Sequence, residues 1–478
     1  MEFETVIGLE VHVQLSTKSK IFCGSSTQFG AEANEFVDPV TMGFPGALPV
    51  LNKKVVEYAI MLGLAMNCEI RKFNRFARKH YFYPDLPKGY QISQFDEPIC
   101  ERGHIMINFN DSQRTIGIMR IHMEEDAGKN IHDPRTEASL VDLNRAGVPL
   151  LEVVSEPDLR SPSEAAAYLR TIRQIVRYLN VSDGNMEEGS LRCDANISLR
   201  PKGETKLGTR TEIKNMNSFK FVERALEYEI ARQSALLKAG KEIIQETLLF
   251  DSVAGTTHSM RSKEESADYR YFPDPDLPPV IVEESWIREV ASHMPKLPDQ
   301  MAKEFVDVYG LSPYDAAILS GERANVDFFL EMFAVCPNAK AACNWLTSEL
   351  FGVLNASGIE LKDSPISPKN LGSLIKLIDD EVISGKMAKS VFEEMFKTSK
   401  SPNEIVEAQG LKQITDNSAI AGIVQDIFAK NESQLKEFLG GNERLLGFFV
   451  GQVMKASAGN ANPKKVNEII LEEAKKLK

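Results

Sequence analysis

IGIMRIHMEEDAGK, residues Ile116 to Lys129, is the stretch of sequence that decides the fold. Apolar and polar residues alternate through most of it at the two-residue period of a β-strand. The period predicts two opposite faces, an apolar one with Met119, Ile121 and Met123 and a polar one with Arg120, His122 and Glu124. Glu125 then ends the apolar row, which predicts a carboxylate at the edge of a core.

The same stretch carries three consecutive acids, Glu124, Glu125 and Asp126, followed by a glycine and Lys129. Carboxylates beside a turn and a cation are what the binding of a nucleotide phosphate through Mg²⁺ requires. An alternative is that the acids lie on a solvated face or begin a helix. The metal interpretation is favoured because other predicted strands repeat the pattern.

The composition is that of a globular protein with several domains. A chain of 478 residues exceeds one ordinary core and predicts roughly two to four domains. The net charge of −12 argues against nucleic-acid binding through bulk positive charge, so any such contact must be local. The six cysteines show no disulfide or zinc spacing, and no apolar run approaches a signal peptide or the ~20 residues of a membrane span. We therefore expect a cytoplasmic protein that does not enter a membrane.

Two other predicted strands also carry acidic residues. In residues 4–15 the polar face carries Glu10 and His12, which at a separation of about 6.5 to 7 Å can reach one ion. An edge strand with a solvated face is the alternative. Glu152 stands alone among Leu and Val residues, where a buried carboxylate must be paired, bind a metal or turn outward.

Two later segments, residues 188–200 and 208–219, repeat the alternation. Their polar faces carry Arg192, Asp194 and Asn196 in the first segment and Arg210, Glu212 and Lys214 in the second. If these faces converge on one concave sheet, they form a charged basin suited to Mg²⁺ and phosphate chemistry. Separate, half-exposed strands are the alternative.

Residues 80–94 mix aromatic residues with Pro and Gly and are predicted to form an ordered loop, with Lys79 and Lys88 as its cations. The rings can pack over a ligand while the ammonium groups meet phosphate or carboxylate. A surface loop held by its prolines is the alternative. A second loop is expected over residues 259–278.

Helical spacing predicts helices over residues 53–66, 161–179 and 221–240, and it dominates from residue 299 onward. The fold class is therefore α+β. Three domains are expected: residues 1–293 with the sheet, an all-α domain over 294–402 and a small helical tail domain over 403–478.

In the tail, three lysines bracket a Gly-Asn-Ala-Asn-Pro turn: Lys455, Lys464 and Lys465. A local basic turn can contact an RNA backbone although the whole chain is acidic. A solvated C-terminal helix is the alternative.

Common phosphate-binding and catalytic motifs are missing from the sequence. It contains no GxxxxGK[ST] loop, no GxGxxG after a strand, no HExxH and no GxSxG. If the chain uses ATP, it must do so through acidic strands and Mg²⁺.

Eight segments together resemble the GatB family, the B subunits of the bacterial tRNA-dependent amidotransferases of the GatCAB type. They occur in order from the first strand to the tail: ETVIGLEVHVQL, HYFYPDLPKGYQISQ, RIHMEEDAGK, DLNRAGVPLLEVVSEPD, EGSLRCDANISLR, TEIKNMNSF, DYRYFPDPDLP and VGQVMKASAGNANP. The resemblance implies a cradle-shaped N-terminal domain built on antiparallel sheet, with an ATP and Mg²⁺ kinase site. It also implies a helical domain and a tail domain that recognises tRNA.

The implied reaction is that of a glutamine-dependent aminoacyl-tRNA amidotransferase, a carbon–nitrogen ligase. The side-chain carboxylate of Asp or Glu, misacylated on tRNA(Asn) or tRNA(Gln), is phosphorylated, and ammonia displaces the phosphate. The chain shows no glutaminase nucleophile, so ammonia is expected to be channelled from a partner amidase, the glutaminase component of GatCAB, which a further small component joins to this chain in a heterotrimer. The sequence does not tell whether one or both tRNAs are substrates.

The resemblance also implies residue roles. The metal set expected from the motifs is Glu10, His12, Glu125 and Glu152. The groups expected on the cofactor are Glu124, Asp126, Lys129, Arg192, Asp194 and Asn196. Lys79 and Lys88 are expected to steady phosphate or line the ammonia route, and the three tail lysines to contact tRNA. No zinc is expected, because only Cys23 remains of the cysteines that hold zinc in some members, with Ser25 and Asp38 to Thr41 at the matching places.

Two alternatives remain open. One is an ATP-dependent carboxylate–amine ligase acting on a free metabolite, which predicts a tail without tRNA affinity. The other is a non-catalytic tRNA-binding scaffold, which predicts no ATP turnover even with every partner present.

Overall fold

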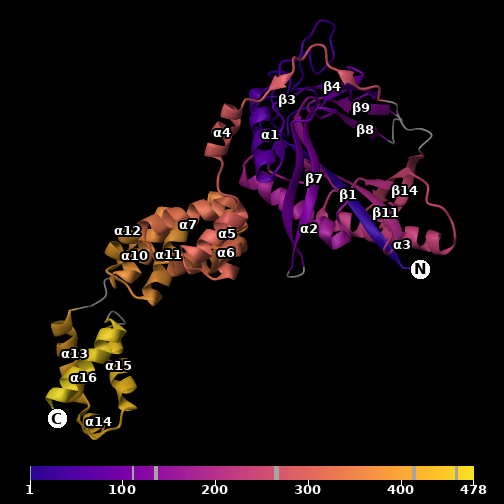
Figure 1. Ribbon diagram of the computed structural model, residues 1–478. Coiled ribbons are helices and arrows are strands. Elements are labelled where there is room, and N and C mark those ends of the chain that lie inside the picture. The colour runs from indigo at the N-terminus through magenta and orange to yellow at the C-terminus, as the bar shows by residue number, and fades with distance from the viewer. Residues whose placement is uncertain are drawn as a thin grey trace. The chain divides into compact units, whose positions relative to one another are not determined.

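The computed structural model describes residues 2–109, 112–133, 138–262, 269–411, 416–457 and 461–477, without the side chains of 132, 133, 261 and 262. The chain divides into two compact units, Met1–Leu297 and Pro298–Lys478. The first unit combines sheets with helices and the second is helical, which confirms the α+β class (Figure 1). The division of the helical part at residue 402 stays a prediction. Parts of the loop expected over 259–278 and of the tail turn lie outside the described residues.

A nine-stranded sheet forms the body of the first unit, in the order β14-β13-β12-β11-β1-β10-β7-β6-β2. Its strands are β1 Phe3–Gln14, β2 Glu69–Ile70, β6 Cys100–Phe109, β7 Ser112–Glu125, β10 Pro149–Ser155, β11 Leu191–Pro201, β12 Thr211–Lys214, β13 Glu246–Asp251 and β14 Thr256–Ser262. Neighbouring strands pair antiparallel, except that β12 and β13 pair in parallel. The long strand β1 lies between β10 and β11 at the centre.

Helices cover one face of this sheet. Ile7, Leu9, Val11 and Val13 of β1 are fully or almost fully buried in a core shared with α1 Lys53–Ala65, α2 Pro162–Tyr178 and α3 Phe219–Lys238 (Figure 1). Burying each such side chain contributes about 1.5–3 kcal/mol. The three predicted helices are confirmed, and the Ser161 hydroxyl accepts a hydrogen bond from the Glu164 amide at the start of α2. The polar residues of β1 are left for the other face.

The first unit also contains three smaller sheets. They are β15 Phe272–Pro273 with β4 Ala77–His80 and β5 Tyr90–Ser93, β16 Val280–Ile281 with β3 Phe73–Asn74, and β8 Lys129–Asp133 with β9 Ala138–Asp142. The prediction of a loop over residues 80–94 is therefore wrong at its C-terminal end. Residues 90–93 pair antiparallel with residues 77–80, because the hairpin buries Ile92 in the core.

The alternation predicted within β7 is wrong at Met119. Ile118 pairs with Ser155 and Arg120 with Val154, so that Met119 is an extra residue in a β-bulge. Ile118 and Ile121 are both buried, whereas Met119 is 41% exposed. The bulge resets the alternation before the acidic end of the strand is reached.

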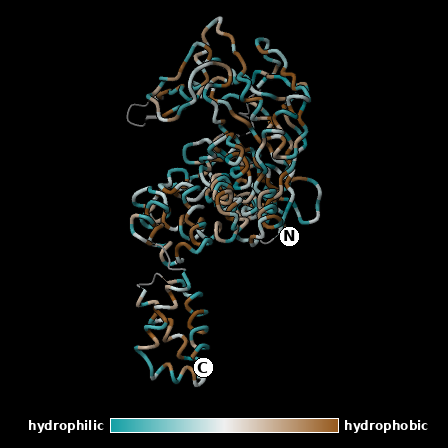
Figure 2. Tube along the Cα trace, turned by 90° about the vertical axis from the view of Figure 1, so that its left-hand side faces the viewer, coloured by the Kyte–Doolittle hydropathy of each residue, from teal (hydrophilic) through white to brown (hydrophobic). Residues whose placement is uncertain are grey.

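Beyond α4 Glu284–His293, the second unit is helical. It contains α5 Pro298–Asp307, α6 Pro313–Ser320, α7 Arg323–Val335, α8 Ala339–Asn344, a π-helical turn Trp345–Leu350, α9 Phe351–Ser357, a 3₁₀ turn Leu361–Asp363, α10 Pro368–Asp379, α11 Gly385–Thr398, α12 Pro402–Gln409, α13 Asn417–Lys430, α14 Glu432–Leu439, α15 Leu445–Ala456 and α16 Pro463–Lys476. Helix α12 packs against α10 and α11, and α13, α15 and α16 share a separate core around Phe449 and Ile470. Apolar and polar residues are interspersed along these helices (Figure 2), and among the described residues no helix has the length and apolarity to cross a bilayer.

We expect Gly147→Ala to lower the free energy of unfolding by about 1–2 kcal/mol, because Gly147 turns the chain into β10 with a φ of 80°. A Cβ there would also lie 3.0 Å from Thr41 Cγ2. Urea titration of the full chain measures the change. Gly24→Ala is the control, because the Cβ added there meets no atom within 4 Å. Equal effects of the two substitutions would contradict the prediction.

Candidate functional site

The face of the large sheet opposite the three helices gathers polar side chains from neighbouring strands. His12 of β1 lies opposite Glu152 of β10 on one side and Arg192 of β11 on the other. Glu152 in turn lies opposite His122 of β7. Residues directly opposite each other in an antiparallel pair project to the same side of the sheet. The register therefore brings together side chains that are far apart in the sequence.

Two histidines and two glutamates form an imidazole–carboxylate cluster, which we define as His12, His122, Glu124 and Glu152. The Nε2 atom of His12 lies 3.7 Å from Glu124 Oε1 and 3.5 Å from Glu152 Oε2. The Nε2 atom of His122 lies 3.7 Å from Glu124 Oε2 and 3.2 Å from Glu152 Oε2. One ligand atom each of His12, Glu124 and Glu152 lies within 4.8 Å of the other two, so a single cation can contact all three.

The charges of this cluster compensate one another. Burial lowers the pKa of His12, but Glu152 and Glu124 outweigh burial and raise it. The same balance raises the pKa of His122 to about 9. Burial raises the pKa of Glu152, but His122 and His12 hold it well below its ordinary value. Near neutral pH the protonated ring of His122 therefore faces the carboxylate of Glu152.

Lys79 approaches this cluster from the neighbouring three-stranded sheet. Its Nζ lies 4.8 Å from the centre of the Tyr269 ring. Burial lowers the pKa of Lys79, but Tyr271, Glu124 and other neighbours outweigh it and raise the pKa above the ordinary value. Lys79 is thus a cation beside the cluster, where a phosphate can meet it.

A second group of carboxylates lies beside the cluster and forms an acidic cluster, Glu10, Asp194 and Glu212. Lys214 Nζ contacts Asp194 Oδ2 at 2.5 Å and Glu212 Oε1 at 2.9 Å. Asn196 donates a hydrogen bond of 3.0 Å to Glu10. Burial and the neighbouring acids raise the pKa of Glu10. The predicted polar faces of residues 188–200 and 208–219 thus meet that of β1.

Asp126 and Arg192 bind each other. Both guanidinium Nη atoms of Arg192 donate to the two carboxylate oxygens, at 2.8 and 3.0 Å, and Gln14 donates to the same carboxylate at 2.7 Å. Burial raises the pKa of Asp126, but Arg192 and Arg145 outweigh it and lower it. Lys129 lines a neighbouring hollow of about 480 Å³ that Gln14 and Arg145 also border. Three of the residues expected on the cofactor therefore lie at one end of β1, namely Asp126, Lys129 and Arg192.

The structure does not bring Glu125 to the cluster. Glu125 lies on the face of β7 that carries Met123, and Lys88 Nζ contacts its carboxylate oxygens at 2.5 and 2.6 Å. The Ile92 amide donates a further hydrogen bond of 2.9 Å. The expected metal set is thus divided, with His12 and Glu152 in the imidazole–carboxylate cluster, Glu10 in the acidic cluster and Glu125 on the opposite face. The physical reason is that successive side chains of a strand point to opposite faces, so Glu125 cannot share the face of Glu124.

The sequence analysis placed His122 on the polar face but gave it no role. Its position two residues before Glu124 on the same strand is the signal that could have found it. In the second unit, Lys455 and Lys464 are exposed, and Asn462 caps α16 by accepting hydrogen bonds from the amides of Lys464 and Lys465.

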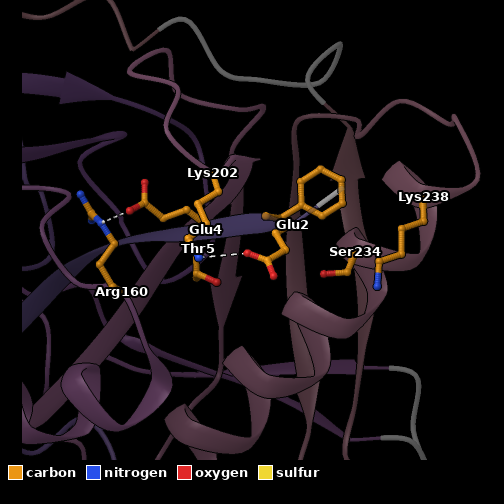
Figure 3. Close-up of a pocket in the computed structure, with 8 residues that line it drawn as sticks. Glu2, Glu4, Thr5, Arg160, Lys202, Ser234 and Lys238 are labelled. Atoms are coloured by element: carbon orange, nitrogen blue, oxygen red, sulfur yellow. Dashed lines mark hydrogen bonds and ion pairs between the residues drawn. The ribbon is translucent and has the colours of Figure 1, made fainter.

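A hollow of about 510 Å³ lies at the other end of β1 (Figure 3). Lys202 Nζ contacts Glu2 at 2.9 Å, and Arg160 Nε lies 3.8 Å from Glu4, so charged side chains around it pair with one another. Glu4 and His12 are eight residues apart along the strand, about 26 Å. This hollow is therefore separate from the imidazole–carboxylate cluster.

A pH dependence of stability follows from the raised pKa of His122, about 9 against an ordinary 6.5. A group whose pKa is raised by folding stabilises the folded state fully below its unfolded pKa and loses this contribution as the pH rises through its folded pKa. In EDTA, we expect wild type to have a higher free energy of unfolding than His122→Gln. This difference should shrink between about pH 6.5 and 9. Urea titrations across this range test it, and an advantage independent of pH would contradict it.

Comparison with known proteins identifies the family of the chain. The family model of the GatB/GatE catalytic domain matches residues 5–288, and that of the GatB domain matches residues 327–474. Similar relatives are named as the B subunit of aspartyl/glutamyl-tRNA(Asn/Gln) amidotransferase. The one from Thermodesulfovibrio yellowstonii is 57% identical over 470 residues, which cover 98% of this chain and 99% of the relative.

Other relatives of that name give the same result. The protein of Trichlorobacter lovleyi is 57% identical over 470 residues, covering 98% of this chain and 99% of the relative. That of a Geobacter species is 55% identical over 476 residues, which cover 99% of each. The resemblance seen in the sequence segments is confirmed, and the chain belongs to the GatB family.

Proposed function

We propose that this chain is the component of a glutamine-dependent aminoacyl-tRNA amidotransferase that activates the substrate carboxylate. In this proposal, the side chain of Asp on tRNA(Asn), of Glu on tRNA(Gln), or of both takes the γ-phosphoryl group of ATP. The nitrogen lone pair of ammonia then attacks the carbonyl carbon of the acyl phosphate, and phosphate leaves with the electrons of the C–O bond. The observation that carries the proposal is the imidazole–carboxylate cluster on the helix-free face of the sheet in a member of the GatB family.

The residues of the cluster fit a divalent cation. Histidine nitrogens and carboxylate oxygens are ordinary ligands of such ions, and His12, Glu124 and Glu152 present theirs within 4.8 Å of one another. When bound, Mg²⁺ with ATP would neutralise charge on the transferred phosphoryl group. Lys79 stays protonated beside the cluster and can orient a phosphate oxygen. Asp126 holds the guanidinium of Arg192 near one end of the same face.

The positions of the other predicted site residues also support the proposal. Lys88 and Glu125 form a buried ion pair on the far face of β7, away from the cluster, which supports a place on the ammonia route rather than on the phosphate. The exposed Lys455 and Lys464 support a tRNA contact in the tail. The proposal includes two protein partners in the cytoplasm, a glutaminase and a small joining protein. Neither a free-metabolite ligase nor a non-catalytic scaffold is favoured by the family relatives.

We expect His12→Ala to reduce amide formation at least about a hundredfold while glutamine hydrolysis continues, because the cation loses a ligand and the carboxylate is no longer activated. The measurement uses the chain assembled with both protein partners, misacylated tRNA, ATP and glutamine. His258→Ala, at an exposed position of β14, is the control. Wild-type amide formation by His12→Ala would refute the role of the cluster.

The second test of the proposal concerns the buried ion pair. We expect the paired substitution Lys88→Met with Glu125→Gln, which removes both charges together, to reduce glutamine-dependent amide formation several-fold while activity with added ammonium chloride is retained. Removing both partners avoids the cost of leaving one buried charge alone. Equal losses with glutamine and with ammonium would instead assign the pair to carboxylate activation.

A further inference from the structure

We propose that the hollow lined by Lys129 receives the aminoacyl end of the substrate tRNA. Glu188 binds the α-ammonium group of the aminoacyl residue there, and Lys129 binds its side-chain carboxylate. This assignment rests on the proposed function, because it names the residues that recognise its substrate. It gives Lys129 a role towards the substrate rather than towards ATP, and it gives Glu188 a role that the sequence did not predict.

The hollow lies next to the imidazole–carboxylate cluster along β1. It has a volume of about 480 Å³, and Gln14 at the end of β1 lines it. Gln14 projects to the same face as His12, two residues away, which is about 6.5 to 7 Å along the strand. A ligand in the hollow can therefore extend a short side chain towards the cluster.

The segment 181–190 is held beside the end of β1. The Gln14 amide donates to the Ser190 carbonyl and the Ser16 amide to the Val181 carbonyl, both at 2.8 Å. Residues from the segments 27–31, 142–148 and 183–190 line the hollow together with Gln14 and Lys129. Parts of the chain that are far apart in the sequence therefore build one binding space.

Two opposite charges in this hollow have no partner. Neither the Glu188 carboxylate nor the Lys129 ammonium forms a hydrogen bond or an ion pair with any residue that the structure describes. The other charged groups of the lining are engaged, because Asp142 and Asp183 accept hydrogen bonds from backbone amides and Arg145 donates to two backbone carbonyl groups. Glu188 and Lys129 are both exposed, so a ligand can reach them.

This pair of charges fits a zwitterionic ligand. An aspartyl or glutamyl residue esterified to tRNA has an α-amino group, which is protonated below about pH 7.7, and a side-chain carboxylate. One carboxylate and one ammonium in the same hollow complement these two groups and fix the orientation of the ligand.

The charges of the hollow favour the aminoacyl group over ATP. The polyphosphate of ATP offers no cationic group for Glu188 to bind. The lining also has three carboxylates, those of Asp142, Asp183 and Glu188, against two cationic side chains, those of Lys129 and Arg145. An excess of negative charge opposes a polyphosphate and favours an ammonium group.

Phe29 gives the hollow a surface for the terminal adenosine of the tRNA. Its side chain lines the same hollow and is 73% exposed. Exposed aromatic rings bind single-stranded nucleic acids because a base can stack on them. The ester bond joins the aminoacyl group directly to the terminal ribose, so the base and the aminoacyl group can bind in one small site.

Binding of two matched ligands to the full chain tests this inference. Both are 3′-amino-3′-deoxyadenosine carrying an acyl group, aspartyl in one and succinyl in the other, so that they differ only in the α-ammonium group. A stable amide bond replaces the ester, and calorimetry at pH 6.5 measures both affinities. We expect wild type to bind the aspartyl compound at least about fivefold more tightly, and Glu188→Gln to bind the two about equally.

A third ligand tests Lys129. The asparaginyl compound has an amide in place of the side-chain carboxylate of the aspartyl compound. We expect wild type to prefer the aspartyl compound about threefold or more. Lys129→Gln should lose this preference and keep the preference for the aspartyl over the succinyl compound.

Glu187→Gln is the matched control, because Glu187 is also exposed and adjacent in sequence but is not among the residues that line the hollow. It should keep both preferences. Thermal unfolding checks that each variant is folded. The comparison of the three ligands in wild type needs no variant at all.

Four results would overturn the inference. They are no binding of the aspartyl compound, equal affinity of wild type for the aspartyl and succinyl compounds, equal effects of Glu187→Gln and Glu188→Gln, or weaker binding of ATP by Glu188→Gln, which would assign the hollow to the nucleotide. None of them depends on amide formation, so the proposed function is tested separately. Conversely, an assembled enzyme that forms no amide would refute the function, and the measured ligand preferences would remain.

Discussion

The pairing of β1 with β10 and β11 is the constraint on which the rest of the site depends. It sets His12 opposite Glu152 and Arg192 on the open face, while Val11 and Val13 enter the core on the other. A slip of one residue would send the buried valines to water and the imidazole into the core. The hydrophobic burial that fixes the register therefore also fixes the position of the polar groups. One strand pairing therefore positions both the core and the site.

Buried charge in the site is matched almost group by group. The imidazoles face Glu124 and Glu152, Arg192 holds Asp126, and Lys88 holds Glu125. Leaving one such charge without its partner costs about 3–5 kcal/mol. A cation that binds the imidazole–carboxylate cluster therefore replaces an existing balance of charge rather than filling a bare acidic pocket.

Much of this arrangement could be predicted from the sequence. The two-residue alternation of residues 4–15 and 188–200 identified the strands and the polar faces of Glu10, His12 and Asp194, because a long strand buried on one face leaves a clear pattern. The bulge at Met119 could not be predicted, since it depends on pairing with a distant strand. The pairing of residues 90–93 with 77–80 was missed for the same reason, because Pro and Gly dominate the local sequence between them. The contact between His122 and Glu152 could not be predicted, because only the pairing of β7 with β10 sets the two residues opposite each other.

The acidic run at the end of β7 shows why spacing along the sequence is not proximity in a site. Its three carboxylates contact three different partners. Glu124 contacts the imidazoles, Glu125 contacts Lys88 and Asp126 contacts Arg192. The run also joins two sheets, because Ser93 donates to Glu124 and the Ile92 amide donates to Glu125. These bonds anchor β5 to the end of β7, and β5 carries its hairpin partner β4 with Lys79. Glu125 therefore affects the cluster indirectly, because its own carboxylate lies on the opposite face of the sheet. By holding β5 in place, it helps to position Lys79 beside Glu124.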